Sequence, residues 1–534
     1  MAWLVNRRTG MTHQKPRAFL RLLPAAAFVL LAALALSAAP PARAATTITV
    51  CPAGCDYDNV PDAVAAAADG DTIDIAAGNY VLLDVPPITI DKALTLRGAG
   101  VDVTTLRRDA SNFGRVITVL AGAEVLVEDL TITGGRSVVE METVTQACAM
   151  AGSTSSASAV GAVGDEPVPW AVTADSPVIP NPCGASAKTA SSSLSIAISG
   201  WCGAYASVDN NVDHDTQGPA TATSTSDVTL RGGGVFNAGV LTLRQVKVAG
   251  NSLSGTASAA TTAGDDATSA TATATAIVRL LGGGIYNEGS LTIERSTISG
   301  NTVLASGAAS ALAGTDGGSG VTARANPYAV VAGGIYNDGG LILRDSTVSG
   351  NSVTSSLSST LATGGAPAVT ETDAAATTIG AGGIVNDGSV TATNSTVSGN
   401  LFAASSASDD ENAVYAAGGL FDGRYPATLN FTTVAANQLA ISRFGEGAAT
   451  GFTAGGVVTA RPPDVPGRPP VPTSAVGPSV SPNPPGGNLY LFGSVVSGND
   501  GGDCAYGPLV ASVHSGYSLT GDGSCNVPQG DADL

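Results

Sequence analysis

The sequence predicts an all-β protein whose coils stack into a solenoid, a parallel β-helix, and three observations carry this prediction. Nearly the same stretch of 20 residues occurs four times, at 232–251, 282–301, 332–351 and 381–400. The copies are 50, 50 and 49 residues apart, a period that is typical of stacked structural units. Aromatic residues make up only 4% of the chain, which favours many thin repeated layers over one broad core.

The first 44 residues have the features of an export signal. Arg17 and Arg21 precede an apolar run, and Ala42-Arg43-Ala44 provides a cleavage site of the A-x-A type. No later apolar run approaches the ~20 residues that a membrane-spanning helix needs. We therefore expect a secreted or cell-surface protein that has no membrane span after the signal is cleaved.

The segment 45–135 is expected to hold the N-terminal cap and the first coils. A helix is predicted from Pro61 to Ala68, a strand over 72–75 and a turn at Gly78-Asn79, followed by alternating apolar residues from Ile88 to Leu96. The first coil of a solenoid has an open apolar face, so a short amphipathic helix is expected to cover it.

The segment 227–456 contains the repeated coils. In the second copy, Ile285, Leu291, Ile293 and Ile298 alternate with polar residues in three short runs, which predicts three strands per coil. Stacking at about 4.8 Å would place each of them on its equivalent in the next coil. The glycines are expected to supply positive φ and close approach at a corner. A nucleotide-binding loop is excluded because neither a Lys-Ser/Thr pair nor a helix follows them.

Asparagines are predicted to tolerate the left-handed bend at the corners and to stack in ladders of side-chain hydrogen bonds. The two sets of equivalent positions are Asn237, Asn287, Asn337 and Asn386, and Asn251, Asn301, Asn351 and Asn400.

The GGGIYN and STISGN words resemble the repeats of right-handed parallel β-helix proteins of bacteria, and they are similar to those of the chlamydial polymorphic outer-membrane proteins, a family implicated in adhesion. The resemblance covers the four copies, with degenerate coils at 417–438 and 488–500. The N-terminal order of helix and strands looks like the opening of pectin-lyase-like proteins. These resemblances imply a right-handed solenoid with an adhesin-like role.

The segment 486–534 is expected to form a C-terminal coil. Its GGDC word, followed about 20 residues later by GSC, resembles the last coil of exported choice-of-anchor β-helix proteins. The resemblance implies a disulfide between Cys504 and Cys525.

Seven cysteines remain in the exported chain, where disulfides persist. Metal binding is the alternative, but the chain has no CxxC word, and only His214 and His514 remain after cleavage. The expected pairs are Cys51 with Cys55, Cys183 with Cys202, and Cys504 with Cys525, which leaves Cys148 without an assigned partner.

Insertions rich in Ala, Ser and Thr separate the coils. They alternate small residues with Thr or Ser on both sides of a Gly/Asp-rich centre, which predicts hairpins that stack side by side as a fin; a disordered linker is the alternative. A cysteine-containing insertion spans 136–226, and a Pro-rich excursion spans 457–485.

Charge excludes one class of partner. The leader carries six basic and no acidic residues, so 18 basic and 43 acidic residues remain after cleavage, a formal net charge of −25. Such a chain is not expected to bind nucleic acid.

No catalytic constellation is recognised on the coils. The Gln-Asp, Asn-Thr-Asp and Gly-His-Gly words of polysaccharide-active β-helices do not occur there. The acidic clusters Asp265-Asp266 and Asp409-Asp410-Glu411 fall at insertion tips, where solvated loops are expected, with weak Ca²⁺ binding as the alternative. No cofactor is predicted otherwise.

Three arginines, Arg97, Arg107 and Arg108, are candidates for binding an acidic glycan, with ordinary surface charge as the alternative. Two main functions follow: a non-catalytic, adhesin-like or cell-envelope interaction protein whose partners are glycans or other cell-surface molecules, or a polysaccharide-binding or polysaccharide-cleaving β-helix. A regular Thr-Ala run near 271–275 adds ice binding as a third hypothesis. Flat Ser/Thr-rich faces would favour the first function, and carboxylates converging on coil strands the second.

Overall fold

The computed structural model describes residues 44–83, 85–148, 153–164, 187–190, 201–212, 219–264, 269–314, 320–364, 369–408, 410–444, 448–460, 489–506, 513–516 and 518–525. The chain divides into two units, Met1–Ala45 and Thr46–Leu534, and the second contains the fold. The expected export signal lies outside the described residues apart from Ala44. Of the predicted Pro-rich excursion over 457–485, Val457–Thr459 instead form a strand, and residues 461–485 lie outside the described residues.

Four sheets make up the second unit, and we call them A to D. Sheet A contains β1 Thr47–Val50, β2 Thr72–Ile75, β3 Gly78–Leu82, β5 Leu94–Arg97, β6 Thr104–Arg108, β8 Glu124–Thr133, β15 Val240–Ala249, β19 Ser290–Glu294, β20 Thr297–Ser299, β24 Gly340–Arg344, β25 Thr347–Ser349, β29 Ser389–Thr393, β30 Thr396–Ser398, β34 Ala427–Asn430, β35 Thr433–Ala435, β40 Leu489–Phe492, β41 Val495–Ser497, β43 Val513–Gly516 and β44 Leu519–Thr520. Sheet B contains β4 Ile88–Ile90, β7 Ile117–Val119, β14 Val235–Asn237, β18 Ile285–Asn287, β23 Ile335–Asn337, β28 Ile384–Asn386, β33 Leu420–Asp422, β39 Val457–Thr459 and β42 Cys504–Tyr506.

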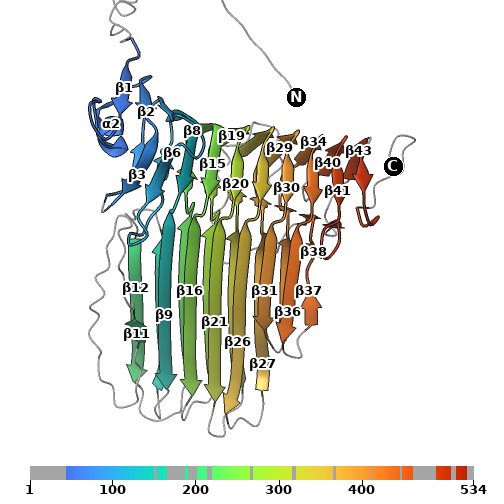
Figure 1. Cartoon of the computed structure of the whole chain (residues 1–534). Coiled ribbons are helices and arrows are strands. Elements are labelled where there is room, and N and C mark those ends of the chain that lie inside the picture. The colour runs from blue at the N-terminus through green and yellow to red at the C-terminus, as the bar shows by residue number, and fades with distance from the viewer. Residues whose placement is uncertain are drawn as a thin grey trace, which may run out of the picture. The chain divides into compact units, whose positions relative to one another are not determined.

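Sheets C and D lie beside the solenoid and form what we call the fin (Figure 1). Sheet C contains β9 Arg136–Cys148, β11 Ala187–Ala190, β16 Ser252–Gly264, β21 Thr302–Gly314, β26 Ser352–Gly364, β31 Leu401–Ala407 and β36 Gln438–Phe444. Sheet D contains β10 Ser153–Gly164, β12 Trp201–Val212, β13 Ala220–Arg231, β17 Ala270–Leu281, β22 Val321–Ala332, β27 Val369–Ala381, β32 Glu411–Ala417, β37 Ala448–Thr450 and β38 Thr453–Ala454.

One coil runs from sheet B through two strands of sheet A, out along sheet C, back along sheet D and into sheet B of the next coil. The repeated words meet in register, so that Ile285 pairs with Ile335 and Asn287 with Asn337 in parallel strands. Leu291, Ile293 and Ile298 are fully buried between sheets A and B. The prediction of an all-β, right-handed parallel β-helix is confirmed by this pairing.

The glycines of the repeat have the predicted backbone role. Gly282 adopts a φ of +78°, and a Cβ atom at Gly283 would lie 2.5 Å from the carbonyl oxygen of Gly333 in the next coil. Only a residue without a side chain allows the coils to approach this closely.

The predicted left-handed conformation of the ladder asparagines is wrong. Asn287 lies at the end of an extended strand, and at the second ladder the preceding glycine carries the positive φ, +62° at Gly300. Extended backbone directs the amide into the stack, while the glycine makes the bend at no steric cost.

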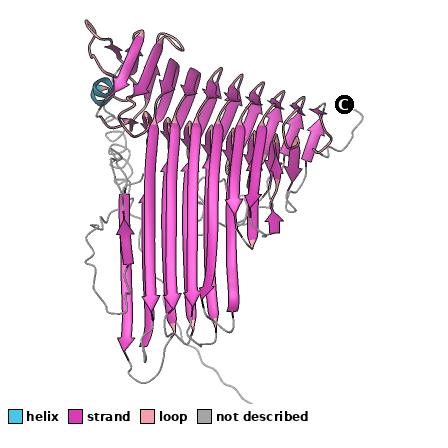
Figure 2. Ribbon diagram, turned by 60° about the horizontal axis from the view of Figure 1, so that its bottom comes forward, coloured by secondary structure: helices cyan, strands magenta, loops and turns pink. Residues whose placement is uncertain are grey.

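The N-terminal cap is present as a helix at one end of the solenoid (Figure 2). Helix α2 spans Val60–Ala66, its Asn59 side chain accepts a hydrogen bond from the Asp62 amide at 2.9 Å, and Pro61 occupies its first turn. These are the residue types that favour a helix start. The predicted turn at Gly78-Asn79 is wrong, because β3 begins at Gly78 and pairs with β6.

The insertions form a fin as predicted, but their arms do not pair as hairpins. Strand β16 pairs with β9 and β21 of the neighbouring coils in sheet C, and β17 pairs with β13 and β22 in sheet D. The physical reason is burial, because two facing sheets each hide one side of every arm. Small residues such as Ala257, Ala272 and Ala309 fill the space between them.

The cysteine-containing insertion closes the N-terminal edge of the fin differently. Strand β12 pairs antiparallel with β10, and β11 pairs antiparallel with β9. These antiparallel strands are the outermost strands of the fin at this end, β12 in sheet D and β11 in sheet C.

Candidate functional site

The structure brings the eight predicted asparagines together in two rows of buried amides. In the first row, each Nδ2 donates to the Oδ1 of the next coil at 2.7 Å, from Asn237 to Asn287, Asn337 and Asn386. In the second row the corresponding distances are 3.0, 2.9 and 3.0 Å along Asn251, Asn301, Asn351 and Asn400. All eight side chains are inaccessible to solvent, so neither row is placed to contact a ligand.

Each row ends on an aspartate that sequence reasoning missed. In the first row, Asn386 donates to Asp422 at 2.8 Å. Burial raises the pKa of Asp422 well above its usual range, the hydrogen bond from Asn386 lowers it, and the neighbouring Asp387 raises it further. In the described part of the chain, Asp422 Oδ2 has no hydrogen-bond partner, and neither does Oγ1 of Thr459, the residue paired with Asp422. A neutral carboxyl group therefore suits this position.

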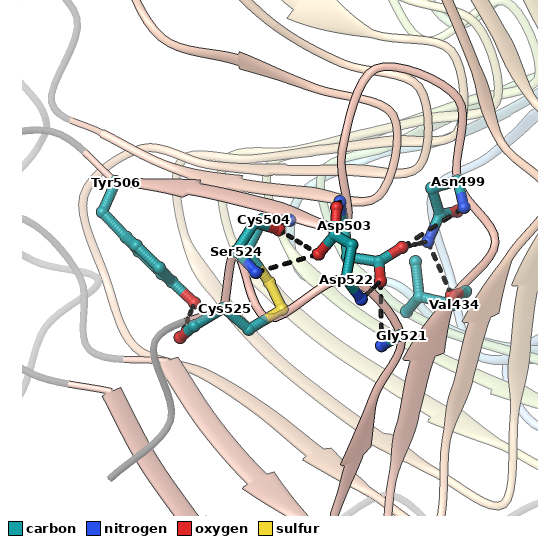
Figure 3. The surroundings of a disulfide bond; sticks show 9 residues. All are labelled: Val434, Asn499, Asp503, Cys504, Tyr506, Gly521, Asp522, Ser524 and Cys525. Carbon is teal, nitrogen blue, oxygen red and sulfur yellow. Dashed lines mark hydrogen bonds between the residues drawn. A yellow bond between two sulfur atoms is a disulfide. The ribbon is translucent and has the colours of Figure 1, made fainter.

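The second row continues through Asn437 and Asn499 to Asp503, the aspartate of the GGDC word (Figure 3). Asp503 accepts hydrogen bonds from the Asn499 amide group at 3.0 Å and from the backbone N–H groups of Gly521 and Asp522, both at 3.0 Å. The GGDC word therefore closes a ladder, and the signal for this role was the SGN-like frame at 497–499.

Two of the three predicted disulfides are present. Cys51 bonds to Cys55 with a Cα–Cα distance of 5.5 Å, and Cys504 bonds to Cys525 with 4.7 Å. Figure 3 shows the second beside Asp503, with the Tyr506 hydroxyl donating to the Cys525 carbonyl oxygen at 2.8 Å. The predicted pair of Cys183 with Cys202 and the leftover Cys148 concern side chains outside the described ones.

A third ladder, of serines, was not predicted. The backbone amide of Ser296 donates to Ser346 Oγ at 3.2 Å, and the amide of Ser346 donates to Ser395 Oγ at 3.3 Å. The Ser-Thr pair that every later copy repeats was the available signal.

The arginines proposed as glycan contacts do not form a free basic patch. Arg97 binds Glu128 at 2.7 Å and begins an alternating row along sheet A that continues through Arg244, Glu294 and Arg344. Arg108 is buried and donates to backbone carbonyls. Only Arg107 of the three is exposed without belonging to that row.

The acidic clusters at the insertion tips offer little to a cation in the described residues. Asp410 accepts from the Ala374 amide at 2.7 Å, and Glu411 accepts from the Thr450 hydroxyl at 2.7 Å. In this part of the chain, no group of three or more His, Cys, Asp or Glu side chains is placed to hold a metal ion. Asp265, Asp266 and Asp409 lie outside the described residues.

Carboxylates do follow one another on the coils, directly after the first ladder. Glu288, Asp338 and Asp387 occupy this position on successive coils, and the Tyr336 hydroxyl donates to Asp387. Only Glu288 is exposed, whereas Asp387 is 4% exposed. An acid and a base that act on a polymer must both reach it, which the buried Asp387 does not.

An exposed aromatic platform distinguishes the C-terminal coils. Phe431 is 69% exposed and Phe492 is 42% exposed, and their coils are joined by a hydrogen bond of 2.7 Å from the Phe431 amide to the Phe492 carbonyl oxygen. The ring of Tyr490 stacks on that of Phe492 at 16° with centroids 6.5 Å apart. A Cβ at Gly493 would lie 2.6 Å from the Phe431 ring, so the ring lies over this glycine. We call Phe431, Tyr490 and Phe492 the aromatic platform.

The backbone under the platform is strained. Phe431 has a φ of +48°, and equivalent corners of other coils carry Arg295, Asp345, Asn394 and Gly493 at positive φ. Asn and Gly tolerate this conformation, whereas a bulky aromatic residue rarely adopts it. The strained residue is thus the most exposed large apolar side chain described.

The stacked sheets and corner ladders define the class of this protein, a parallel β-helix with an extended fin. No protein-family model and no curated protein matches the chain. Among solved structures it is similar to a pectin methylesterase in complex with a hexasaccharide, at 12% identity over 65% of this chain and 80% of that chain, with a TM-score of 0.20. It is also similar to the A-module of the Azotobacter vinelandii mannuronan C-5 epimerase AlgE6, at 15% identity over 76% of this chain and 93% of that chain, with a TM-score of 0.18. The AlgE4 A-module from the same organism gives 11% identity, 73% and 90% coverage, and a TM-score of 0.17. Likenesses this weak carry no functional argument. The class of fold rests on the strand pairing of this chain itself.

Within the residues that the structure describes, no helix has the length and apolar character needed to cross a membrane.

Proposed function

We propose that this chain is an exported, non-catalytic, adhesin-like surface protein that binds a neutral glycan on the aromatic platform. The observation that carries the proposal is Phe431, a bulky residue held at positive φ with 69% of its surface exposed. Left-handed backbone costs about 1–2 kcal/mol for a residue with a side chain. Equivalent corners carry Gln245, Arg295 and Asp345 at a similar φ. Phe431 differs from them in placing an exposed aromatic ring where other coils have a polar residue, and a binding role explains this choice.

The chemistry of the platform suits a sugar ring. An aromatic ring carries partial negative charge on its face, which attracts the polarised C–H groups on the flat side of a pyranose. Asn430 and Thr428 are paired with Phe492 and Tyr490 on the neighbouring strand, and their half-buried side chains offer hydrogen bonds to sugar hydroxyls. A few polar groups beside an apolar surface are the usual composition of such sites.

Charge selects the kind of glycan. The chain has a formal net charge of −19, and more negative if its leader is removed, so an acidic polysaccharide would be repelled. The two disulfides support the exported location, because such bonds persist in oxidising compartments. The alternative, a polysaccharide-cleaving enzyme, has less support because Asp387 in the carboxylate row is buried.

The test is a glycan array probed with residues 45–534, followed by titration of the best ligand and analysis for cleavage products. Phe431→Asn should weaken binding about tenfold, the effect of losing ~1.4 kcal/mol of aromatic contact, while the free energy of unfolding rises by about 1 kcal/mol as strain is relieved. Arg295→Asn is the matched control, since Arg295 occupies the same corner at a φ of +48° without the platform.

The control should bind as the unmodified chain does. Unchanged binding by Phe431→Asn, or equal loss in both variants, would contradict the proposed site. Turnover of any polysaccharide would contradict the non-catalytic role.

A further inference from the structure

Most of the outer side of sheet C is a wide surface without charge. Four adjacent strands, β16, β21, β26 and β31, contain no Asp, Glu, Lys or Arg anywhere in their lengths. Figure 1 shows them side by side along the fin. We call their outward residues the uncharged face: Ser252, Ser254, Thr256, Ser258, Ala260, Thr262, Thr302, Leu304, Ser306, Ala308, Ser310, Leu312, Ser352, Thr354, Ser356, Ser358, Thr360, Ala362, Leu401, Ala403, Ser405 and Ala407.

The opposite side of the same fin is different. The outer face of sheet D carries Asp227 bound to Arg279 at 2.7 Å and Arg324 bound to Glu371 at 2.5 Å. Exposed sheet surfaces of soluble proteins ordinarily carry such charges, which keep them from associating. Charged residues thus occur on the outer side of sheet D, whereas on the outer side of sheet C the four strands β16, β21, β26 and β31 have none.

The uncharged face, like the buried interior behind it, consists mainly of small residues, although most of those on the face are Ser and Thr. Its Ala, Ser and Leu alternate along each strand with inward residues such as Ala257, Ala309 and Leu357, which pack sheet C on sheet D. Leu304 is 51% exposed and Leu312 is 41% exposed on this face. Sheets with small side chains pack closely face to face, as stacked flat sheets do. Sheets C and D already pack on each other in this way within the fin.

The area fits a stable contact between proteins. Three strands of 13 residues and one of seven cover a plane of roughly 700 Å², taking about 3.3 Å per residue and about 4.8 Å between strands. A standard interface buries about 800 Å² on each partner. Depletion of charge at its centre and a polar rim are also typical, and Arg136, Glu140 and Glu142 of β9 border the face in register with Ser252, Thr256 and Ser258.

We propose that the uncharged face binds the same face of a second copy of this chain, forming a two-fold symmetric dimer with four packed sheets. Two chains that each carry a formal charge of −19 repel one another through most of their surfaces, and this face is where they approach without that cost. The uncharged face shares no residue with the aromatic platform, whose Tyr490 and Phe492 lie on β40 of sheet A.

The experiment is sedimentation equilibrium of residues 45–534 over a range of concentrations. The double variant Ser306→Lys and Ser356→Lys places two charges in the middle of the face, at positions that are exposed and paired with each other. Its matched control is Thr223→Lys with Thr273→Lys, likewise paired on neighbouring strands but on the outer side of sheet D.

The unmodified chain and the control should sediment as dimers, and the Ser306/Ser356 variant as a monomer with an unchanged circular dichroism spectrum. A monomeric unmodified chain would overturn the proposal. Dimers that survive the Ser306/Ser356 substitutions, or dimers lost equally in the control, would place the contact elsewhere and overturn it as well. A variant that loses its spectrum is replaced by Thr354→Lys alone, for which the same outcomes apply.

Discussion

Replacing Asn287 with Leu tests whether the first ladder stabilises the coil stack. Asn287 is fully buried, donates to Asn337 Oδ1 at 2.7 Å and to the Gly340 carbonyl at 3.1 Å, and accepts from Asn237 at 2.7 Å. Leucine is similar in size but leaves Asn337 Oδ1 without its donor on Asn287, and it removes the acceptor on Asn287 to which the Asn237 amide group donates. An orphaned buried polar group costs about 1–3 kcal/mol, so two affected amides give an expected loss of roughly 3 kcal/mol.

Urea unfolding followed by far-UV circular dichroism measures this loss as a lower midpoint. The matched control is Thr292→Leu, which makes a similar change on the outward side of the same coil, where Thr292 is half-buried. Surface substitutions of this kind change stability by about 0.5 kcal/mol or less. An Asn287→Leu midpoint equal to that of the unmodified chain, or to that of Thr292→Leu, would refute a stabilising role for the ladder.

Three further predictions concern the ladder ends, the charged row and the C-terminal coil. Burial raises the pKa of Asp422 in the fold above 3.8. The stability that its neutral carboxyl group contributes is therefore complete below that pH and is lost as the pH rises through the folded pKa. Asp422→Asn should raise the urea midpoint most at alkaline pH, and a uniform gain at all pH values would contradict this. Arg244→Met should lower stability by no more than about 1 kcal/mol, since its ion pairs are partly exposed, and thermal unfolding in high salt should abolish the difference. Replacing Cys504 and Cys525 with Ser should cost about 3 kcal/mol for a loop of this length, seen as faster amide hydrogen exchange confined to the C-terminal coil; protection unchanged there would count against it.

The coils could be predicted from the sequence because the repeat supplies their register. The spacing of Asn287 and Asn337 sets which residues stack, and alternation about Ile293 sets which side is buried. Asn437, Asn499 and Asp422 were missed because their coils have degenerate words. At Asp422 the ladder residue itself has changed from Asn, Asn437 lacks the preceding Gly, and Asn499 keeps the SGN frame in a coil whose other words have changed.

The pairing of the fin could not be read from the pattern. Alternation of small residues with Ser and Thr has the same period of two in a hairpin and in two facing sheets. What separates them is the choice of partner, which depends on burial of Ala257 and Ala272 between the sheets. The platform was hidden for a different reason: Phe431 is unusual only once its φ of +48° is known.

The pairing of each fin arm with its two neighbours limits how the length of an arm can change. Shortening β21 alone would leave backbone groups of both β16 and β26 without partners, and each unpaired group that water cannot reach costs free energy. At an end of the stack only one neighbour is affected. The arms of sheet C accordingly keep 13 residues through β26 and fall to seven at β31 and β36. The strands of the fin thus become shorter toward one end of the stack and not in its middle.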